Sequence, residues 1–413
     1  MSGLAERGRP AVDVLAELDA MRSGDVRWRD GRAFTLVYYA GPELYEVARQ
    51  AYELYMAENG LNTNAFPSLA RMQSEVVEMV LGLMHGSTAA GFMTSGGTES
   101  ILMAVLAARE RGRAERNVAA PEMVLPASAH AAFEKAAHYF GVKSVRVPVR
   151  ADWRADVDAM AAVVNDSTVL VVGSSPQYPQ GVVDPIEAIA AIASDRGISC
   201  HVDACMGGIT LPFLEQLGRA IPPWDFRVDG VTSISVDLHK FGYTAKGASV
   251  IAYRTKELRR YQTFVTDNWL GGLYGSSGVL GTKSGGAMAA AWAVMNHLGQ
   301  DGYRQLTATA RAATERLAVG IGEIDGLVLR AEPDTTLLAF GATGDVDAFA
   351  VADALWRRGW YIDRQGPPPS LHCTINAAHD AVIDGFLADL AACVDEVRTS
   401  ARSGGQGAYG TIE

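Results

Sequence analysis

The chain has little lysine and fewer basic than acidic side chains. Its 413 residues include 36 Lys or Arg and 47 Asp or Glu, which gives a formal net charge of −11 at pH 7. Only six of the basic residues are lysines, and two of these, Lys240 and Lys246, stand close together beside His239. An acidic balance argues against general nucleic-acid binding, which needs a basic surface to displace counterions. We therefore expect no nucleic-acid partner.

Cysteine is also scarce, and long apolar runs are absent. The four cysteines, Cys200, Cys205, Cys373 and Cys393, form no CxxC pair and no zinc-ligand spacing with histidine, so neither a disulfide framework nor a metal site is predicted. The chain lacks any run of about 18 consecutive apolar residues. Its first thirty residues lack the apolar core of a signal peptide. These absences predict a cytoplasmic protein without a transmembrane segment.

What the chain does contain is the composition of a folded globular protein. Hydrophobic residues make up 48% of it and charged residues 20%, which is typical of a chain that buries a large core. We predict an N-terminal arm or helical segment over residues 1–60, a large α/β domain over residues 61–300, a small α+β domain over residues 301–400 and a flexible tail over residues 401–413.

Apolar strands alternate with helical stretches over the middle of the chain. Segments such as Met123–Pro126, Val169–Ser174 and Ile198–Val202 are almost continuously apolar, which is typical of strands covered on both faces. This pattern predicts an α/β fold with a mostly parallel sheet and helices on both faces. Ahead of the first of these strands, we expect residues 91–100 to form a short loop that leads into a helix over Ile101–Arg109.

That expected loop contains Thr94-Ser95-Gly96-Gly97-Thr98. Glycines let a phosphate approach the backbone, the hydroxyl groups can donate hydrogen bonds, and the helix N-terminus offers free N–H groups with a favourable dipole. By itself the motif fits an ordinary loop and helix cap equally well. It indicates a phosphate site only in combination with other features.

Two charged residues follow predicted strands. Asp203 ends the strand that contains His201, and Lys240 follows the strand Val231–Val236. Ligands of an α/β sheet bind at the carboxyl ends of its strands. A buried Asp at such a place needs a partner, and a partly buried Lys with a cationic neighbour such as Lys246 is expected to have a lowered pKa and to form Schiff bases. The alternatives are a helix N-cap for Asp203 and a surface turn for Lys240.

A fourth feature is His130, which begins a predicted helix after a strand. Its ring can stack on a flat cofactor, or it can bond to the backbone at the helix start. Together the four features predict a site for pyridoxal 5′-phosphate. The glycine loop would hold the phosphate, Lys240 would bind the cofactor covalently, and Asp203 would keep the pyridine nitrogen protonated so that the ring withdraws electrons. The combination is more specific than any of its members.

Five segments carry a wider resemblance: Thr94–Ser100, Ser128–Phe133, His201–Cys205, Val231–Lys240 and Gly271–Ser276. They closely resemble sphingosine-1-phosphate lyases, which are fold-type I pyridoxal phosphate enzymes alongside the group II amino-acid decarboxylases. The likeness runs over nearly the whole chain. It implies the fold-type I transferase fold, with a seven-stranded, mostly parallel sheet and a small C-terminal α+β domain. It also implies pyridoxal phosphate as cofactor and a homodimer with the site at the interface.

The resemblance further implies roles for single residues. Lys240 would bind the cofactor covalently, Asp203 would face its pyridine nitrogen, and His130 would stack on its ring. The remaining cofactor contacts would come from Ser95, Gly96, Gly97, Thr98, Ser175 and His239. Lys246 and Tyr38 would be catalytic, and they would line the substrate pocket together with Asn62, Asn64, Tyr274 and Lys283.

Departures from the family pattern fall on polar positions of the substrate pocket. The family's Leu-His-Pro-Asp reads Leu61-Asn62-Thr63-Asn64 here, so Asn62 replaces a histidine that helps to hold the substrate phosphate. The family's Gly-Ser-Arg-Pro-Gly-Gly has Lys283 in place of Arg, and its Pro-x-x-Pro-His-Gly has Gln180 in place of His. Phosphate recognition depends on such donors. We expect the family's cofactor chemistry with an altered substrate pocket.

For the reaction, the resemblance implies retro-aldol cleavage of a β-hydroxy amine, phosphorylated or not, to an aldehyde and an amine. The alternative is α-decarboxylation of an amino acid, because the same electron sink serves a carboxylate leaving group. A binding or scaffold protein on this fold is a third hypothesis, and the presence of both Lys240 and Asp203 argues against it.

Overall fold

The computed structural model describes residues 3–400 and 403–405. Residues 401–402 and 406–413 of the predicted flexible tail lie outside the described residues.

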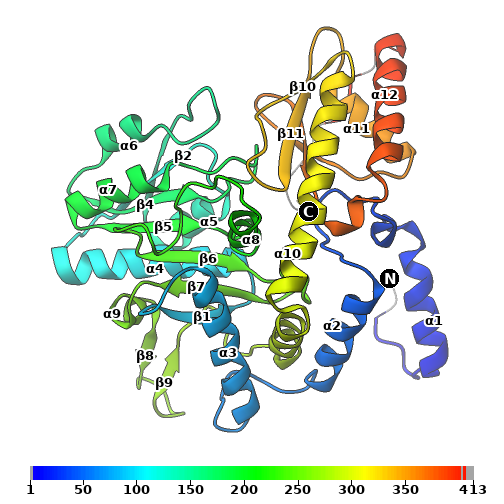
Figure 1. The fold of residues 1–413 in the computed structure, drawn as a ribbon. Coiled ribbons are helices and arrows are strands. Elements are labelled where there is room, and N and C mark those ends of the chain that lie inside the picture. Colours follow the sequence, from blue (N-terminus) through cyan, green and yellow to red (C-terminus); the bar gives the residue numbers. More distant parts are fainter. Residues whose placement is uncertain (1–2, 401–402, 406–413) are drawn as a thin grey trace.

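A seven-stranded sheet forms the centre of the larger part of the molecule (Figure 1). Its strands are β1 (Ala90–Thr94), β2 (Glu122–Pro126), β3 (Lys143–Val147), β4 (Thr168–Ser174), β5 (Ser199–Asp203), β6 (Ser233–Asp237) and β7 (Ser249–Tyr253). Their order in space is β1-β7-β6-β5-β4-β2-β3. The sheet is parallel from β3 to β6, and β7 runs antiparallel to both of its neighbours. The predicted mostly parallel, seven-stranded sheet is confirmed.

Helices cover both faces of this sheet (Figure 1). They are α3 (Pro67–Leu83), α4 (Gly97–Arg116), α5 (Ala132–Phe140), α6 (Val157–Val163), α7 (Ile186–Arg196) and α8 (Thr210–Gln216). Successive strand residues point to opposite faces. In β7, Ile251 packs into the apolar cluster of α4 and α5, whereas Val250 and Ala252 pack into the cluster of α3, α7 and α8. Strands that are buried on both faces explain the continuous apolar runs of the sequence.

The prediction of a loop over residues 91–100 is wrong for the first half of this segment, because β1 occupies Ala90–Thr94. Gly and Ser next to this segment indicated a turn, but all five strand residues are buried. Gly91 is required by close packing, since a Cβ there would lie 2.7 Å from a methyl carbon of Val77 on α3. The helix after the loop also starts earlier than expected, at Gly97.

The long helix α10 (Gly285–Glu323) leads from this sheet to a smaller α+β part, with a break at Gly299 (Figure 1). That part contains an antiparallel sheet and two helices. They are β10 (Leu327–Leu329), β11 (Leu337–Ala342), β12 (Asp363–Gln365), β13 (Ser370–Thr374), α11 (Ala348–Arg357) and α12 (Ile383–Ser400). Phe34 joins this core from the N-terminal segment, and its ring centroid lies 4.4 Å from that of Phe386. The small C-terminal domain is confirmed, and the exact domain boundaries stay predictions.

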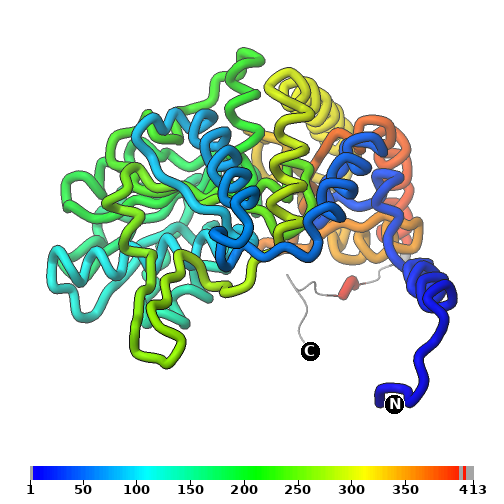
Figure 2. Tube along the Cα trace, turned by 90° about the horizontal axis from the view of Figure 1, so that it is seen from below, coloured from blue at the N-terminus to red at the C-terminus, as the bar shows by residue number. Residues whose placement is uncertain are grey.

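Three elements lie at the periphery. Helix α1 (Ala11–Met21) stands off the body with every residue exposed (Figure 2). Helix α2 (Pro42–Leu54) packs along α10. The hairpin of β8 (Phe264–Thr266) and β9 (Tyr274–Ser276) extends from the sheet domain (Figure 1). Within residues 3–400 and 403–405, no helix is both long and apolar enough to cross a bilayer.

Candidate active site

A cavity of about 370 Å³ lies at the carboxyl ends of β5 and β6. Eight residues predicted from the sequence line it: Ser95, Gly96, Gly97, Thr98, His130, Asp203, His239 and Lys240. Seven further residues complete the lining: Glu99, Ile101, Pro176, Tyr178, Cys205, Met206 and Asp237. The chain thus brings together residues that are almost 150 positions apart in the sequence, as the strand-end rule for α/β sheets leads one to expect.

Asp203 ends β5, and its carboxylate is held by donors from two elements. Its Oδ1 accepts hydrogen bonds from the backbone N–H of Cys205 (3.1 Å) and from the hydroxyl of Ser235 on β6 (3.3 Å). Ser235 is also 3.2 Å from Nε2 of His201, whose pKa burial lowers to about 4. A neutral imidazole therefore supports the serine that orients the carboxylate. Helix α8 begins only at Thr210, which removes the alternative of Asp203 as a helix N-cap.

Lys240 is paired with a carboxylate that the sequence analysis did not single out. Its Nζ lies 2.9 Å from Oδ2 of Asp237, whose side chain is only 2% exposed. Burial lowers the pKa of Lys240, but the charge of Asp237, together with Cys205, Tyr38 and the hydrogen bond to Asp237, outweighs burial and raises the pKa well above its ordinary value. The expected lowering of the Lys240 pKa is therefore wrong. The expectation took the charge of the cationic neighbour Lys246 into account, but not the charge of the anionic neighbour Asp237.

The glycine loop is fixed by Glu99, the third residue of α4. Both the backbone N–H and the hydroxyl of Ser95 donate to Oε2 of Glu99 at 2.7 Å, and Oε1 accepts from the N–H of Val279 at 2.8 Å. At the start of the helix, Gly97 lies directly on Asp237, since a Cβ at Gly97 would be 2.7 Å from its Oδ2. The loop can therefore present the N–H groups of the helix N-terminus to a ligand at close range.

Several buried polar atoms, in His239 of the cavity lining and in segments that lead to other lining residues, have no hydrogen-bond partner within the described residues. They are Oγ of Ser128, Ser174 and Ser175, and Nδ1 of His239. Ser175 itself is buried directly before Pro176, which lines the cavity. Buried groups of this kind cost free energy unless something bonds to them. The unpartnered donors, the glycine loop and the paired Lys240 and Asp203 fit a flat, phosphorylated aldehyde cofactor such as pyridoxal phosphate.

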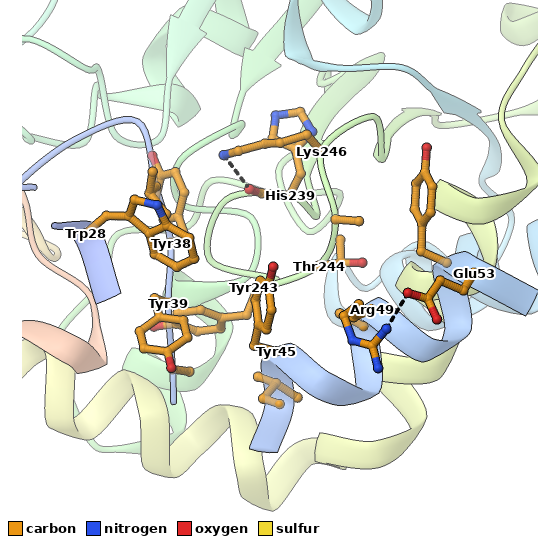
Figure 3. A pocket seen from close by; sticks show the side chains of 16 residues that line it. Trp28, Tyr38, Tyr39, Tyr45, Arg49, Glu53, His239, Tyr243, Thr244 and Lys246 are labelled. Carbon is orange, nitrogen blue, oxygen red and sulfur yellow. Dashed lines mark hydrogen bonds and ion pairs between the residues drawn. The ribbon is translucent and has the colours of Figure 1, made fainter. Parts of the chain in front are cut away.

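Lys246 and Tyr38 lie on the other side of His239, at the wall of a second cavity of about 480 Å³ (Figure 3). Although Lys246 as a residue is exposed, its Nζ donates to the carbonyls of Leu36 (2.8 Å) and His239 (3.3 Å) and lies 5.1 Å from the centre of the Tyr38 ring. Burial of the amine and the charge of Lys240 lower the pKa of Lys246 to about 8. It is the second lysine, and not Lys240, whose pKa moves towards neutrality.

The remaining predicted substrate residues line neither of the two cavities in the described part of one chain. Asn62 and Asn64 are exposed and bond to each other through the N–H of Asn64 and Oδ1 of Asn62 (3.0 Å). Tyr274 lies on the β8–β9 hairpin, and the Nζ of Lys283 lies 4.1 Å from the centre of the Phe92 ring. Their roles as substrate residues stay predictions.

Asp237, Glu99 and Cys205 are among the cavity-lining residues that sequence reasoning missed. Asp237 carried the same signal as Asp203, a carboxylate at the end of an apolar strand, and could have been found. Glu99 directly follows the glycine motif, in which only the hydroxyl groups and the glycines indicated a ligand site. Cys205 carried no sequence signal, and burial raises the pKa of its thiol well above the ordinary value.

Comparisons with known proteins agree with this geometry. The family described as "Pyridoxal-dependent decarboxylase conserved domain" matches residues 21–343. The chain is 41% identical to the sphingosine-1-phosphate lyase of Arabidopsis thaliana over 398 residues, which cover 94% of this chain and 73% of that protein. It is 39% identical to sphingosine-1-phosphate lyase 1 of Rattus norvegicus over 417 residues, with 99% and 73% covered. The chain belongs to the sphingosine-1-phosphate lyase family.

Solved structures support the same assignment. A sphingosine-1-phosphate lyase from Burkholderia pseudomallei superposes with a TM-score of 0.92 at 39% identity, covering 97% of this chain and 94% of that one. A glutamate decarboxylase from Lactobacillus brevis, 21% identical with a TM-score of 0.86 and covering 97% and 96%, shares the fold. This member of the sphingosine-1-phosphate lyase family is a lyase that depends on pyridoxal phosphate. The roles of its individual site residues are predictions.

Proposed function

We propose that the enzyme cleaves the Cα–Cβ bond of a β-hydroxy amine by a retro-aldol reaction and releases an aldehyde and an amine. The observation that carries the proposal is a pair of lysines near His239 whose pKa values are shifted in opposite directions. Lys240 is held by Asp237 in the cofactor cavity, and Lys246 faces the adjoining cavity with a pKa of about 8. Identity with sphingosine-1-phosphate lyases over most of the chain supports the same reaction type.

The residues around the first cavity would hold the cofactor. Lys240 would bind it covalently, the N-terminus of α4 with Gly96 and Gly97 would hold its phosphate, and Asp203 would pair with its ring nitrogen. Once bound, pyridoxal phosphate supplies an electron sink for the pair of electrons from the broken bond. Ser235 and the N–H of Cys205 keep the Asp203 carboxylate oriented for this task.

Lys246 would act as the general base. An amine whose pKa is about 8 is partly neutral near physiological pH and can accept a proton at Nζ. In this proposal Nζ takes the proton from the β-hydroxyl of the substrate, beside the ring of Tyr38. Lys240 is the alternative base, since its Nζ is released when the substrate amine takes its place.

We further assign the active form to a homodimer. Large apolar side chains are exposed along and after the β8–β9 hairpin: Phe264, Val265, Trp269, Leu270, Leu273, Val279 and Leu280. A cluster of exposed large apolar side chains is typical of a protein interface. The hairpin also carries Tyr274, and Lys283 follows it in the chain, so a partner subunit would bring these predicted substrate residues to the other site.

We also propose that the protein is located in the cytoplasm. The four cysteines are unpaired and buried, as is usual in a reducing compartment.

The test of the reaction is product analysis with purified protein and added pyridoxal phosphate. We expect aldehyde release from a β-hydroxy amine, with and without a phosphate group, and none from Lys240→Ala. The second candidate is decarboxylation, which is favoured by 33% identity to a probable L-aspartate decarboxylase of Pyrococcus abyssi and by Asn62 in place of the family's histidine. Carbon dioxide release from an amino-acid panel, without aldehyde from any β-hydroxy amine, would establish that alternative instead.

A further inference from the structure

Glu99 lies between two segments that are far apart in the sequence. It belongs to the first turn of α4 and is 5% exposed. On one side, its Oε2 accepts hydrogen bonds from the backbone N–H and the hydroxyl of Ser95, both at 2.7 Å. On the other side, its Oε1 accepts from the backbone N–H of Val279 at 2.8 Å. One buried carboxylate therefore ties the glycine loop to residues 277–280, the segment that follows the β8–β9 hairpin.

This segment fits closely against the carboxylate. A Cβ at Gly278 would lie 2.7 Å from Oε1 of Glu99 and 3.1 Å from a ring carbon of Phe92 on β1. The backbone N–H of Val279 bonds to Glu99, whereas the side chain of Val279 is 55% exposed, among the apolar side chains that the proposed dimer would cover. A shift of the segment would therefore reach the glycine loop through Glu99.

The hydrogen bonds to Glu99 also use the donors of Ser95. A serine has one backbone N–H and one hydroxyl hydrogen, and both are donated to Glu99. Neither is left for the phosphate of a cofactor. The N–H groups of Gly97 and Thr98, by contrast, belong to the first turn of α4 and have no partner within the helix. Ser95 would thus serve the phosphate site by holding the loop in place.

The charge of Glu99 gives this arrangement a direction that can be measured. A carboxylate beside a phosphate repels it, so charge alone predicts tighter phosphate binding when Glu99 is replaced by a neutral residue. A role in positioning the loop predicts weaker binding, because the hydrogen bonds that order the loop are lost. The sign of the change therefore separates the two effects.

We infer that Glu99 is a positioning residue that holds the phosphate loop against the segment after the hairpin, so that binding of the cofactor's phosphate depends on both contacts. The inference rests on the proposed function for the place of the phosphate at Gly96 and Gly97. It concerns binding alone and can be measured without substrate.

Titration of the cofactor-free protein with pyridoxal phosphate and with pyridoxal, followed by visible absorbance, tests the inference. The ratio of the two affinities measures what the phosphate contributes. Glu99→Gln keeps the size of the side chain, but its amide has a single acceptor oxygen, which can face only one of the two segments. We expect the ratio to fall by about tenfold, the effect of one hydrogen bond to a charged group. Glu110→Gln, further along the same helix and paired with Arg109 and Arg113, should preserve the ratio.

Gly278→Ala breaks the same link from the other side. Its methyl group would meet Oε1 of Glu99, so the segment must shift, and the ratio should fall here as well. Gly275→Ala, on the hairpin itself, places a methyl group where nothing lies within 4 Å, and it should leave the ratio unchanged.

The outcomes of these titrations are distinct. An equal loss of both ligands in Glu99→Gln would mean that Glu99 only stabilises the fold, and a raised ratio would mean that its charge dominates. Either result overturns the inference, as does an unchanged ratio in Gly278→Ala. If the ratio falls in both variants but no β-hydroxy amine is cleaved, the inference stands and the proposed function fails. If aldehyde is released and the ratio stays the same in both variants, the reverse holds.

Discussion

At the scale of single residues, the carboxylate of Asp237 controls the protonation of Lys240. An opposite charge at 2.9 Å favours the ammonium form of the lysine, and only its neutral form can attack the cofactor aldehyde. Asp237→Asn keeps the shape and removes the charge, so the pKa of Lys240 should fall. We expect the pH midpoint for reconstitution of the cofactor-free protein, followed by visible absorbance, to move down by about 1–3 units.

Asp225→Asn is the matched control for this experiment. Asp225 is also a fully buried carboxylate, but it pairs with Arg227 and His85 away from the cavity. Its substitution should leave the midpoint in place, whatever it does to stability. Equal midpoints for Asp237→Asn and the unsubstituted protein would contradict the role of the ion pair.

Lys246 predicts a pH dependence of the reaction. Its pKa is lowered to about 8 by burial and by the charge of Lys240, so the ammonium form prevails below this value and the neutral amine above it. Because the proposed general base is the neutral amine, the rate of aldehyde release should rise as the pH rises through about 8. Lys246→Arg should lose this activity over the whole range, because a guanidinium stays charged throughout. An unchanged pH profile in Lys246→Arg would assign the titration to another group.

At the scale of elements, the junction of the glycine loop with α4 predicts a position that tolerates no side chain. A Cβ at Gly97 would lie 2.7 Å from both Asp237 Oδ2 and Cys205 Sγ, and both neighbours are buried. Gly97→Ala should destabilise the fold by about 1–3 kcal/mol through overpacking and should weaken cofactor retention. Urea unfolding and dialysis against cofactor-free buffer measure the two effects.

Gly82 on α3 provides the comparison for that substitution. A methyl group at this position would meet open space, because nothing lies within 4 Å of where its carbon would stand. Gly82→Ala should stabilise the protein by less than about 1 kcal/mol through helix propensity. Similar effects of the two substitutions would mean that close packing at the loop does not limit Gly97.

At the scale of the whole molecule, the exposed hairpin predicts the assembly. Leu270 is fully exposed and Leu273 is 78% exposed, so covering them removes a large apolar area from water. We expect light scattering to give about twice the 43.9 kDa of one chain. The double substitution Leu270→Asp and Leu273→Asp should give monomers with little activity. Val319→Asp, at an exposed position on α10, should leave the mass unchanged.

Local pattern was sufficient to predict most elements of the fold. The strand predicted over Val169–Ser174 matches β4 (Thr168–Ser174) to within one residue, because a run of almost continuously apolar residues there is buried on both faces. The pattern failed at β1, where Gly91 looks like a turn residue and is a strand residue packed against Val77. That contact is between two separate elements, α3 and β1, and the local pattern of neither element contains it.

The sequence by itself determined that Asp203, Lys240 and the Gly96-Gly97 loop meet at the cofactor cavity. Asp203, Lys240 and the Gly96-Gly97 loop each follow an element of an α/β sheet, and such ends converge at one edge for topological reasons. Only the tertiary structure decided the protonation of Lys240 and placed Lys246 at a second cavity. A pKa depends on burial and on every charge nearby. The pairing of Lys240 with Asp237, and the position of Lys246 away from that pair, could therefore be known only from distances in the folded structure.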